Sequence, residues 1–561
     1  MGKLTEWLGG LSYKVLCGNP DSAEISEVVY DSRKAAPGTV FVCMAGSKTD
    51  SHAFLPQVYE AGCRVFVVEK DAEELCRDEK TEQILGKYLR RGVHGASGIS
   101  GSGCTDSGCA ASGSAPDCVA PSTEASNSAS DRRDIPTVIA VGNGREALAF
   151  LSAARFGHPA EKMTVIGLTG TKGKTTVSYM LKSILEDCGE KVGVIGTNGC
   201  EIAGVHYPTK NTTPESYEIN ERFARMVEAG CRYAVMECSS QGFKMHRTDG
   251  IVFDYGIFLN ISPDHIGPLE HADFDEYLSC KAKIFAQSKT GIINADDMHA
   301  PALIAAQNGR KDFRMLSYGM AENSERPAEL KPDLTASSLH FTADGTFVGT
   351  EFEANGLIND RLRLSLPGAF NVSNALAALC VCSLLGLPED KVRDALSRIH
   401  VNGRMEIVYR SDRFQVLVDY AHNEVSMESL LETLRQYRPK RLVVVFGCGG
   451  NRAKDRRTGM GAAAARAADL TILTADNSRF EKTEDIIADI REAYLSADGD
   501  RKKLLEIPDR REAIGYAVRN AQDGDMIAVI GKGHEDYQEI CGERTHFSDR
   551  EEILKAAEAL E

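Results

Sequence analysis

The sequence contains no run of about 18 apolar residues, the length that a membrane-spanning helix requires. It begins without the basic stretch and apolar core of a secretory signal. None of its 16 cysteines forms a Cys-x-x-Cys pair, and without secretion the cysteines are most simply free thiols. We therefore expect a cytoplasmic protein with no membrane insertion and no disulfide framework.

Basic residues are fewer than acidic ones. The chain has 65 Lys and Arg against 81 Asp and Glu, a net charge of -16. This balance argues against nonspecific binding to nucleic acid or anionic membranes, which needs basic patches. Any polyanionic substrate must then be held by lysines and arginines that are gathered locally.

The 561 residues separate into three parts. Residues 1–160 mix strands and helices, residues 161–402 alternate strand with helix, and residues 403–561 contain four apolar strands between helical segments. The alternation predicts an α/β protein with a mixed N-terminal domain and two doubly wound domains, the last of them Rossmann-like. The Asn-Gly turn within residues 401–405 is a candidate interdomain hinge.

Residues 95–130 differ from the rest, because they are mostly Gly, Ser, Ala, Thr and Pro. Such a stretch has too little apolar surface to offset its ordering entropy, so we expect a disordered insertion in a surface loop. A metal-binding loop is the alternative, but the spacing of Cys104, Cys109 and Cys118 matches no common zinc pattern.

A phosphate-binding loop is predicted at TGTKGKTT, between an apolar strand and a helix. Gly170 and Gly173 permit a tight turn whose N–H groups point at an anion, and the helix adds its positive N-terminal end. Lys174 can reach the terminal phosphates and the Thr175 hydroxyl can ligate Mg²⁺. The strict motif fails at one position, where Leu168 stands in place of the first glycine.

Polar side chains also follow two other strands of the central part. Glu237 ends RYAVMEC, and Asp264 and His265 follow YGIFLNIS. Ligands of an open parallel sheet bind outside the carboxyl ends of its strands, so these groups are candidates for holding Mg²⁺ beside the phosphate loop. A helix cap is the alternative for Glu237, and equally for His265.

Further along the chain stand NTTPES, MECSSQG, MHR, LNISPDHIG, GAFNVSN, GRME, DYAHN, GCGGNR, TADNSR and GKGHEDYQ. Together with TGTKGKTT, these motifs resemble the Mur ligase family, in the family's order and over nearly the whole chain outside the insertion. The resemblance implies a P-loop ATPase-like central domain and an ATP-dependent ligase of peptidoglycan synthesis. Such an enzyme would phosphorylate the D-glutamate carboxylate of UDP-N-acetylmuramoyl-L-alanyl-D-glutamate and let an amine displace the phosphate.

The resemblance also implies roles for individual residues. Catalysis would depend on Lys174, Glu237, His265 and Lys281. Mg²⁺ would be held by Thr175, Glu237, His265 and an N-carbamate of Lys281, which the sequence alone shows only as a helical lysine. ATP would contact Gly170, Thr171, Lys172, Gly173, Lys174, Thr175, Thr176, Asn371, Arg404, Asp419 and His422. The UDP-precursor would contact Ser32, Asn211, Thr212, Thr213, Ser239 and Arg247.

The identity of the amine depends on residues 476–479, Asp-Asn-Ser-Arg, where members that add meso-2,6-diaminopimelate carry Asp-Asn-Pro-Arg. An arginine binds the distal carboxylate of diaminopimelate as a fork, whereas lysine has no such group. We therefore favour diaminopimelate, with L-lysine as the alternative because TGTKGKTT, NTTPES and LNISPDHIGP look more like the lysine-adding subgroup. The amine would contact Arg457, Asp476, Asn477, Ser478, Arg479, Gly531 and Glu535.

Three other interpretations fit the sequence less well. A folate polyglutamylating relative should lack the UDP-binding domain with its DSR at 31–33 and the terminal GKGHED, both of which are present. A catalytically inactive binding subunit should have lost some of the candidate catalytic residues. A P-loop transporter or motor ATPase fits poorly with two extra domains and no membrane segment. We expect a monomeric enzyme that binds ATP, Mg²⁺, a UDP-sugar peptide and a diamino acid.

Overall fold

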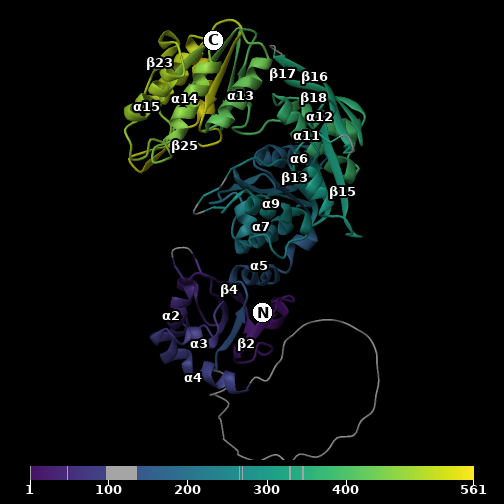
Figure 1. The fold of residues 1–561 in the computed structure, drawn as a ribbon, viewed down its shortest axis with the longest axis vertical. Helices are drawn as coiled ribbons and strands as arrows, with labels where there is room; N and C mark the ends of the chain where they lie inside the picture. The colour runs from purple at the N-terminus through teal and green to yellow at the C-terminus, as the bar shows by residue number, and fades with distance from the viewer. Residues whose placement is uncertain are drawn as a thin grey trace, which may run out of the picture. The chain divides into compact units, whose positions relative to one another are not determined.

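We describe the fold from a computed structural model (Figure 1). The residues that the structure describes are 2–46, 49–95, 135–264, 266–267, 270–327, 330–343 and 347–560. Almost all of the predicted insertion at 95–130 lies outside them. The chain packs as two compact units. The first comprises Met1–Thr164, Thr213–Arg232 and Cys238–Val252, and the second comprises Val165–Thr212, Tyr233–Glu237 and Phe253–Glu561.

The first unit contains a five-stranded sheet in the order β2-β7-β6-β5-β4. Its strands are β2 (Tyr13–Cys17), β4 (Glu27–Val29), β5 (Thr39–Val42), β6 (Val65–Val68) and β7 (Thr137–Val141). The last four pair in parallel, and β2 runs antiparallel to β7. The predicted helix after β7 is α5 (Gly144–Arg155), which begins where the Asn143 side chain accepts from two backbone N–H groups.

The second unit contains an eleven-stranded sheet around the phosphate loop. Strand β8 (Thr164–Thr169) lies between β12 (Tyr233–Glu237) and β13 (Phe253–Phe258). Beyond them come β9 (Val192–Gly196) on one side and β14 (Ser288–Asn294) and β15 (Arg314–Met320) on the other, each paired in parallel with its inner neighbour. Strand β16 (Leu334–Ala343) pairs in parallel with β15. Antiparallel strands complete both edges: β10 (Gly199–Ile202), β11 (Val205–Tyr207), β17 (Val348–Gly356) and β18 (Asp360–Leu364).

Two helices of the same unit pack against each other beside this sheet, α6 (Lys174–Asp187) and α11 (Ala369–Leu385). The second ends at Gly386, whose φ of 63° lets the backbone turn out of the helix, as its sequence predicts. Cys380 and Cys382 of this helix are buried in the hydrophobic core, also as predicted. Although α11 is strongly apolar, neither it nor any other helix in the described ranges is long and apolar enough to cross a membrane.

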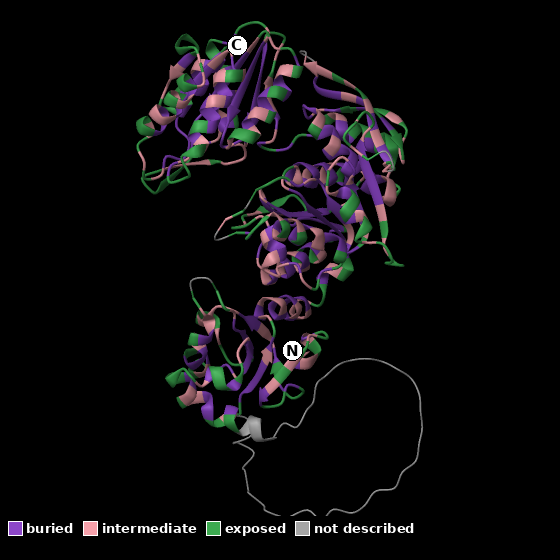
Figure 2. Cartoon of the chain, viewed as in Figure 1, coloured by how far each residue is buried: buried purple, intermediate pink, exposed green. Residues whose placement is uncertain are grey.

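The C-terminal part of the second unit contains a six-stranded sheet, β19-β20-β24-β21-β22-β23. Its parallel strands are β20 (Phe414–Asp419), β21 (Arg441–Phe446), β22 (Leu470–Leu473), β23 (Leu504–Glu506) and β24 (Asp525–Ile530), and β19 (Glu406–Arg410) is antiparallel to β20. Strands β20, β21, β22 and β24 are the four that the sequence predicts. Figure 2 shows their buried residues running through the middle of this part of the chain.

Helices cover both faces of this sheet, and alternate residues of β21 therefore point into two different hydrophobic cores. Leu442, Val444 and Phe446 pack with α13 (Glu424–Gln436), α14 (Asp455–Ala467) and α15 (Thr483–Ser496). Val443 and Val445 pack with α16 (Arg510–Arg519) and α17 (Asp549–Glu558). The predicted α/β class with a Rossmann-like C-terminal domain is therefore confirmed.

Candidate active site

The phosphate loop connects the end of β8 to the start of α6. Gly173 caps the helix with a φ of 87°, and a Cβ at this position would lie 2.4 Å from Oδ1 of Asn374. The loop is also fastened to the end of β13, where Thr171 N donates to Asn260 O at 3.0 Å and Lys172 N donates to Asn260 Oδ1 at 2.9 Å. Glycine is thus required at Gly173 by both conformation and space.

Two predicted catalytic lysines meet at this loop. Lys174 Nζ donates to the carbonyl oxygen of Gly170 at 2.7 Å, and Lys281 Nζ donates to the same oxygen at 2.8 Å. Lys281 comes from α9 (Phe274–Ala286), is only 2% exposed, and has its Nζ 4.7 Å from the centre of the Tyr277 ring. The other lysine of the loop, Lys172, has its pKa lowered by burial.

The carboxylate of Glu237, fully buried at the end of β12, lies at the centre of a hydrogen-bond network. Its Oε2 accepts from the Thr175 hydroxyl at 3.1 Å and from the Thr197 hydroxyl at 3.0 Å, and its Oε1 accepts from Thr197 N at 3.2 Å. The Thr197 hydroxyl is also 3.0 Å from that of Thr212. Sequence reasoning missed Thr197, although it directly follows strand β9 and the strand-end rule applies to it equally.

The Thr175 hydroxyl and the Glu237 carboxylate supply the oxygen ligands that Mg²⁺ prefers. Within the described ranges there is no group of three or more His, Cys, Asp or Glu side chains that could enclose a metal. Mg²⁺ commonly binds through one or two carboxylates plus substrate phosphates, so this sparse donor set beside a phosphate loop fits the ion. His265 lies outside the described residues.

The residues predicted to contact ATP from the C-terminal domain cluster at the hinge. Asp419, at the end of β20, accepts from Met405 N and from Ala421 N, both at 2.8 Å. Burial raises the pKa of this carboxyl. The Arg404 guanidinium stacks 4.5 Å from the centre of the Tyr420 ring. The Asp419 carboxylate therefore ties the predicted hinge, residues 401–405, to the strand.

Asn371 and His422 are placed differently from each other. Asn371 is 2% exposed, donates to Pro367 O at 2.7 Å, and accepts at Oδ1 from Asn374 at 3.1 Å. Asn371 therefore does not contact the phosphate loop directly. It contacts Asn374, and Asn374 is the side chain that approaches Gly173. Nδ1 of His422 lies 2.9 Å from the Tyr420 carbonyl oxygen, and burial lowers its pKa.

Three of the predicted UDP-precursor residues form a connected group in the first unit. Ser239 N donates to Thr213 Oγ1 at 2.8 Å, and Arg247 Nη1 donates to Thr213 O at 2.9 Å. Arg247 also pairs with Glu215 at 2.9 Å. Of the others, Thr212 reaches Thr197, Ser32 begins a separate short helix, Ser32–Lys34, and Asn211 is exposed.

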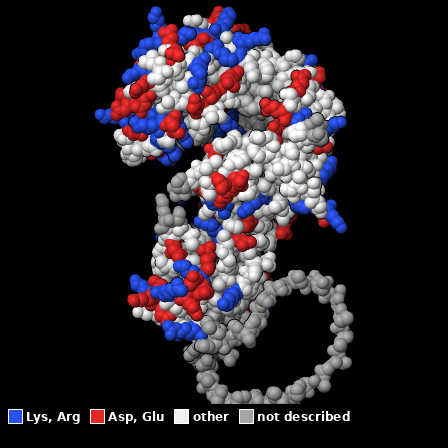
Figure 3. All heavy atoms as spheres, in the orientation of Figure 1, with Lys and Arg blue, Asp and Glu red and all other residues white. Residues whose placement is uncertain are grey.

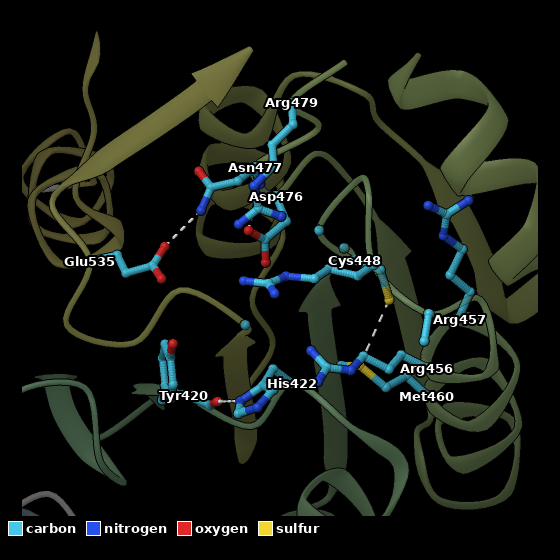
Figure 4. A pocket seen from close by; sticks show the side chains of 15 residues that line it. Tyr420, His422, Cys448, Arg456, Arg457, Met460, Asp476, Asn477, Arg479 and Glu535 are labelled. Atoms are coloured by element: carbon cyan, nitrogen blue, oxygen red, sulfur yellow. Dashed lines mark hydrogen bonds between the residues drawn. The ribbon is translucent and has the colours of Figure 1, made fainter. Parts of the chain in front are cut away.

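A pocket opens at the carboxyl ends of four parallel strands of the C-terminal sheet (Figure 4). Six of the seven residues predicted to bind the amine line it: Arg457, Asp476, Asn477, Arg479, Gly531 and Glu535. Ser478 does not, because it is 1% exposed and its hydroxyl lies 2.6 Å from that of Thr483. Tyr420 and His422 line the same pocket, so a predicted ATP contact borders the predicted amine site.

The arginines of the pocket are not equivalent. Arg457 is 2% exposed, its guanidinium pairs with Glu481 and Asp489 at 2.8 Å each, and Figure 4 shows it pointing away from Asn477 and Glu535. Sequence reasoning missed Arg452 and Arg456, which also line the pocket and form no ion pair with any described carboxylate. Since all three follow β21 in one short stretch, only the side-chain contacts distinguish them.

Glu535 is a partly buried acid of the pocket. Its Oε2 accepts from Asn477 Nδ2 at 2.7 Å and lies 3.4 Å from Lys532 Nζ. Burial raises the pKa of this carboxyl, and the charge of Lys532 opposes the rise. Arg479 has a backbone φ of 50°, in the left-handed region. Its Nη1 donates to Gly450 O at 2.7 Å.

On the face shown in Figure 3, basic and acidic side chains are interspersed over the C-terminal domain instead of forming one patch of a single sign. With a net charge of -16, the protein offers anions little general attraction. A triphosphate would therefore need locally gathered positive groups, and the loop N–H groups, Lys172, Lys174 and Lys281 are the candidates for that role.

Comparison with known proteins gives the same picture over the whole chain. The Mur ligase middle domain matches residues 168–382, and the Mur ligase, glutamate ligase domain matches residues 403–533. A UDP-N-acetylmuramoyl-L-alanyl-D-glutamate--2,6-diaminopimelate ligase of Caldanaerobacter subterraneus is 35% identical over 99% of this chain and 98% of its own length. One from Clostridium perfringens is 33% identical over 99% of both chains.

Solved structures agree. A UDP-N-acetylmuramoyl-L-alanyl-D-glutamate--2,6-diaminopimelate ligase structure has a TM-score of 0.65 at 25% identity and covers 97% of this chain and 96% of its own. A Mycobacterium tuberculosis folylpolyglutamate synthase shares the fold, with a TM-score of 0.54 at 19% identity over 69% of this chain and 92% of its own. The chain belongs to the Mur ligase family of ATP-dependent amide ligases.

Proposed function

We propose that this ligase joins meso-2,6-diaminopimelate to the D-glutamate carboxylate of UDP-N-acetylmuramoyl-L-alanyl-D-glutamate, with L-lysine as the alternative amine. The relatives that match nearly the full chain carry the diaminopimelate-adding name. The observation that carries the proposal is the pocket at the C-terminal sheet, which combines arginines that form no ion pair with a described carboxylate and a partly buried acid, Glu535. The site residues below are assigned on this basis.

The first step has to bring two anions together. An oxygen of the D-glutamate carboxylate attacks the γ-phosphorus of ATP, and the bond to ADP breaks, which leaves an acyl phosphate. At ~4 Å each pair of like charges repels by ~4 kcal/mol at an effective dielectric of about 20. Lys174, the loop N–H groups and the start of α6 supply the opposing positive charge.

Magnesium would be held by Thr175 and Glu237, and a second ion by His265 and an N-carbamate of Lys281. When bound, the ions neutralise charge on the phosphate oxygens. The placement of Lys281 suits carbamate formation, because the reaction needs a neutral amine and burial disfavours the charged one. Thr197 would keep the Glu237 carboxylate in position through its hydroxyl and its backbone N–H.

The second step uses the C-terminal pocket. The amine attacks the acyl carbon, the carbon–oxygen bond to phosphate breaks, and inorganic phosphate leaves as the amide forms. Arg452, Arg456 and Arg479 add positive charge to the pocket, and Asp476 and Glu535 add negative charge. Diaminopimelate brings two carboxylates to this surplus of positive charge, whereas lysine brings one, so the balance favours diaminopimelate.

Arg457 has a supporting role in this proposal, because its guanidinium is already occupied by Glu481 and Asp489. Arg452, Arg456 and Arg479 are the arginines left to bind carboxylates. A Cβ at Gly449 would lie 3.1 Å from Arg479 Nη1 and 3.7 Å from Arg452 Cγ, so both arginine side chains pass beside this glycine.

The test is the rate of phosphate release with ATP, Mg²⁺ and the UDP-dipeptide, measured with each amine. We expect faster release with meso-diaminopimelate than with L-lysine, and only a background rate when the UDP-dipeptide is omitted. Equal or reversed rates would reject diaminopimelate. Release that does not depend on the UDP-dipeptide would reject the whole assignment.

A further inference from the structure

The GKGHED motif contains a lysine that the proposed reaction leaves without a task. Lys532 is 0% exposed, so its ammonium lies behind the amine pocket and not in it. Burying a charge costs free energy unless the charge is fully paired. A buried ammonium beside a binding site is therefore expected to have a specific role there.

The two glycines of the motif account for this burial. Gly531 and Gly533 have φ values of 115° and 53°, on either side of Lys532. A Cβ at Gly531 would lie 2.6 Å from Asp476 Oδ2, and one at Gly533 would lie 2.6 Å from Tyr420 Cβ. The backbone therefore turns sharply on both sides of the lysine, which only glycine permits here.

The ammonium of Lys532 uses all three of its donors inside the protein. It reaches Asn477 Oδ1 at 3.2 Å, Glu535 Oε2 at 3.4 Å, and the carbonyl oxygen of Tyr537. No donor is left for a ligand, so Lys532 can affect the amine only through the residues that it contacts.

Those contacts determine how Asn477 and Glu535 face the pocket. Asn477 Oδ1 accepts from Lys532 and, at 2.9 Å, from Glu539 N, which directs its Nδ2 to Glu535 at 2.7 Å. Asn477 Nδ2 and Lys532 Nζ both donate to Oε2 of Glu535. Within the described part of the chain no hydrogen bond reaches its Oε1, which is the oxygen left for a ligand ammonium.

We propose that Lys532 is a positioning residue of the amine site: its buried ammonium fixes the orientation of the Asn477 amide and keeps the Glu535 carboxylate ionised to receive the distal ammonium of the diamino acid. This inference rests on the proposed function of the pocket. It explains why the motif places a lysine between two glycines, three residues before the acid.

A pH effect follows from the charges around Glu535. The groups that face it from the surrounding elements are Lys532, Asp476, Tyr420, Tyr537 and Arg510. Burial already raises the pKa of the Glu535 carboxyl, and Lys532 is the first opposing charge. Loss of Lys532 raises that pKa further, so the acid protonates as the pH falls and can no longer pair with an ammonium.

The experiment measures the KM of the amine against pH in the full-length enzyme, with whichever diamino acid the wild type uses faster. For Lys532→Met we expect KM to rise by at least roughly 10-fold as the pH is lowered and to recover at high pH. The wild type and the exposed control Lys555→Met should lack this additional rise and show only the common pH dependence that protonation of the attacking amino group imposes, and the KM values for ATP and the UDP-dipeptide should not change.

Glu535→Gln distinguishes the mechanism from simple damage. Its amine KM should exceed the wild-type value at every pH, and Lys532→Met/Glu535→Gln should match it with no pH dependence beyond that of the wild type. A rise in KM over the wild type that is equal at every pH in Lys532→Met, or an additional pH dependence that survives in the double variant, would overturn the proposal.

A second uncharged variant, Lys532→Gln, guards against misfolding and should show the same profile. If both uncharged variants failed to fold while Lys532→Arg folded, the lysine would serve stability alone and the proposal would be wrong. Failure of the diaminopimelate assignment would appear in the wild type as a preference for lysine, whereas failure of this inference appears only in the variants.

Discussion

Lys174 and Lys281 donate to the same oxygen, the carbonyl of Gly170, although 107 positions of the chain separate them. One comes from the helix after the phosphate loop and the other from α9. Their convergence places two amines at the turn where a triphosphate would bind. The site proposed to join nucleotide and carboxylate is therefore built from two helices around one short loop.

Lys281→Ala should abolish ligation, with a loss of at least roughly 100-fold, because the proposed carbamate anion can no longer ligate a metal ion. Acetate at high concentration should restore part of the activity by supplying a carboxylate in the vacated space. Phosphate release measured with and without acetate checks this. Full activity without acetate, or equal rescue of Lys174→Ala, would contradict the carbamate.

Thr197→Val should raise the Mg²⁺ concentration for half-maximal activity by roughly 10-fold, because the hydroxyl that orients Glu237 is lost. The KM of the amine should not change, since the pocket that binds it lies in another sheet. Thr335→Val, at a partly exposed position in β16, is the matched control. An unchanged Mg²⁺ titration would show that Thr197 does not support the metal site.

Arg479→Ala should raise the apparent KM of diaminopimelate by ~10- to 100-fold through lost charged hydrogen bonds, with little effect on the KM of ATP. Steady-state kinetics with each substrate varied in turn provides the measurement. An unchanged amine KM would remove Arg479 from the site.

Arg457→Ala is expected to act through stability instead, because it leaves Glu481 and Asp489 without their shared buried partner. Its thermal unfolding midpoint should fall below that of Arg479→Ala. If Arg457→Ala left stability intact and raised only the amine KM, the two arginines would have to exchange roles.

Much of the fold could be predicted from the sequence, because local patterns determine it. The strand before TGTKGKTT, the apolar strands of the C-terminal sheet and the end of α11 at Gly386 follow from hydrophobic runs and glycine positions. The edge strands β19 and β23 were not anticipated, since they are short and only partly buried.

The site was harder to predict wherever long-range contacts decide a role. Arg452 and Arg457 stand in one stretch of sequence, yet only the carboxylates on α15 and its preceding loop reveal that Arg457 is occupied. Lys532 looks like any loop lysine until the glycines on either side are seen to turn it inward. Thr197 becomes visible only through the carboxylate on a neighbouring strand.

The central claim is that the cations at the phosphate loop let a substrate carboxylate attack ATP. The most direct test labels both oxygens of the D-glutamate carboxylate with a heavy isotope and analyses the released phosphate by mass spectrometry. We predict one labelled oxygen per phosphate in the wild type, and a rate of release reduced by at least roughly 100-fold in Lys174→Ala. Unlabelled phosphate from the wild type, or full ligation by Lys174→Ala, would contradict the account.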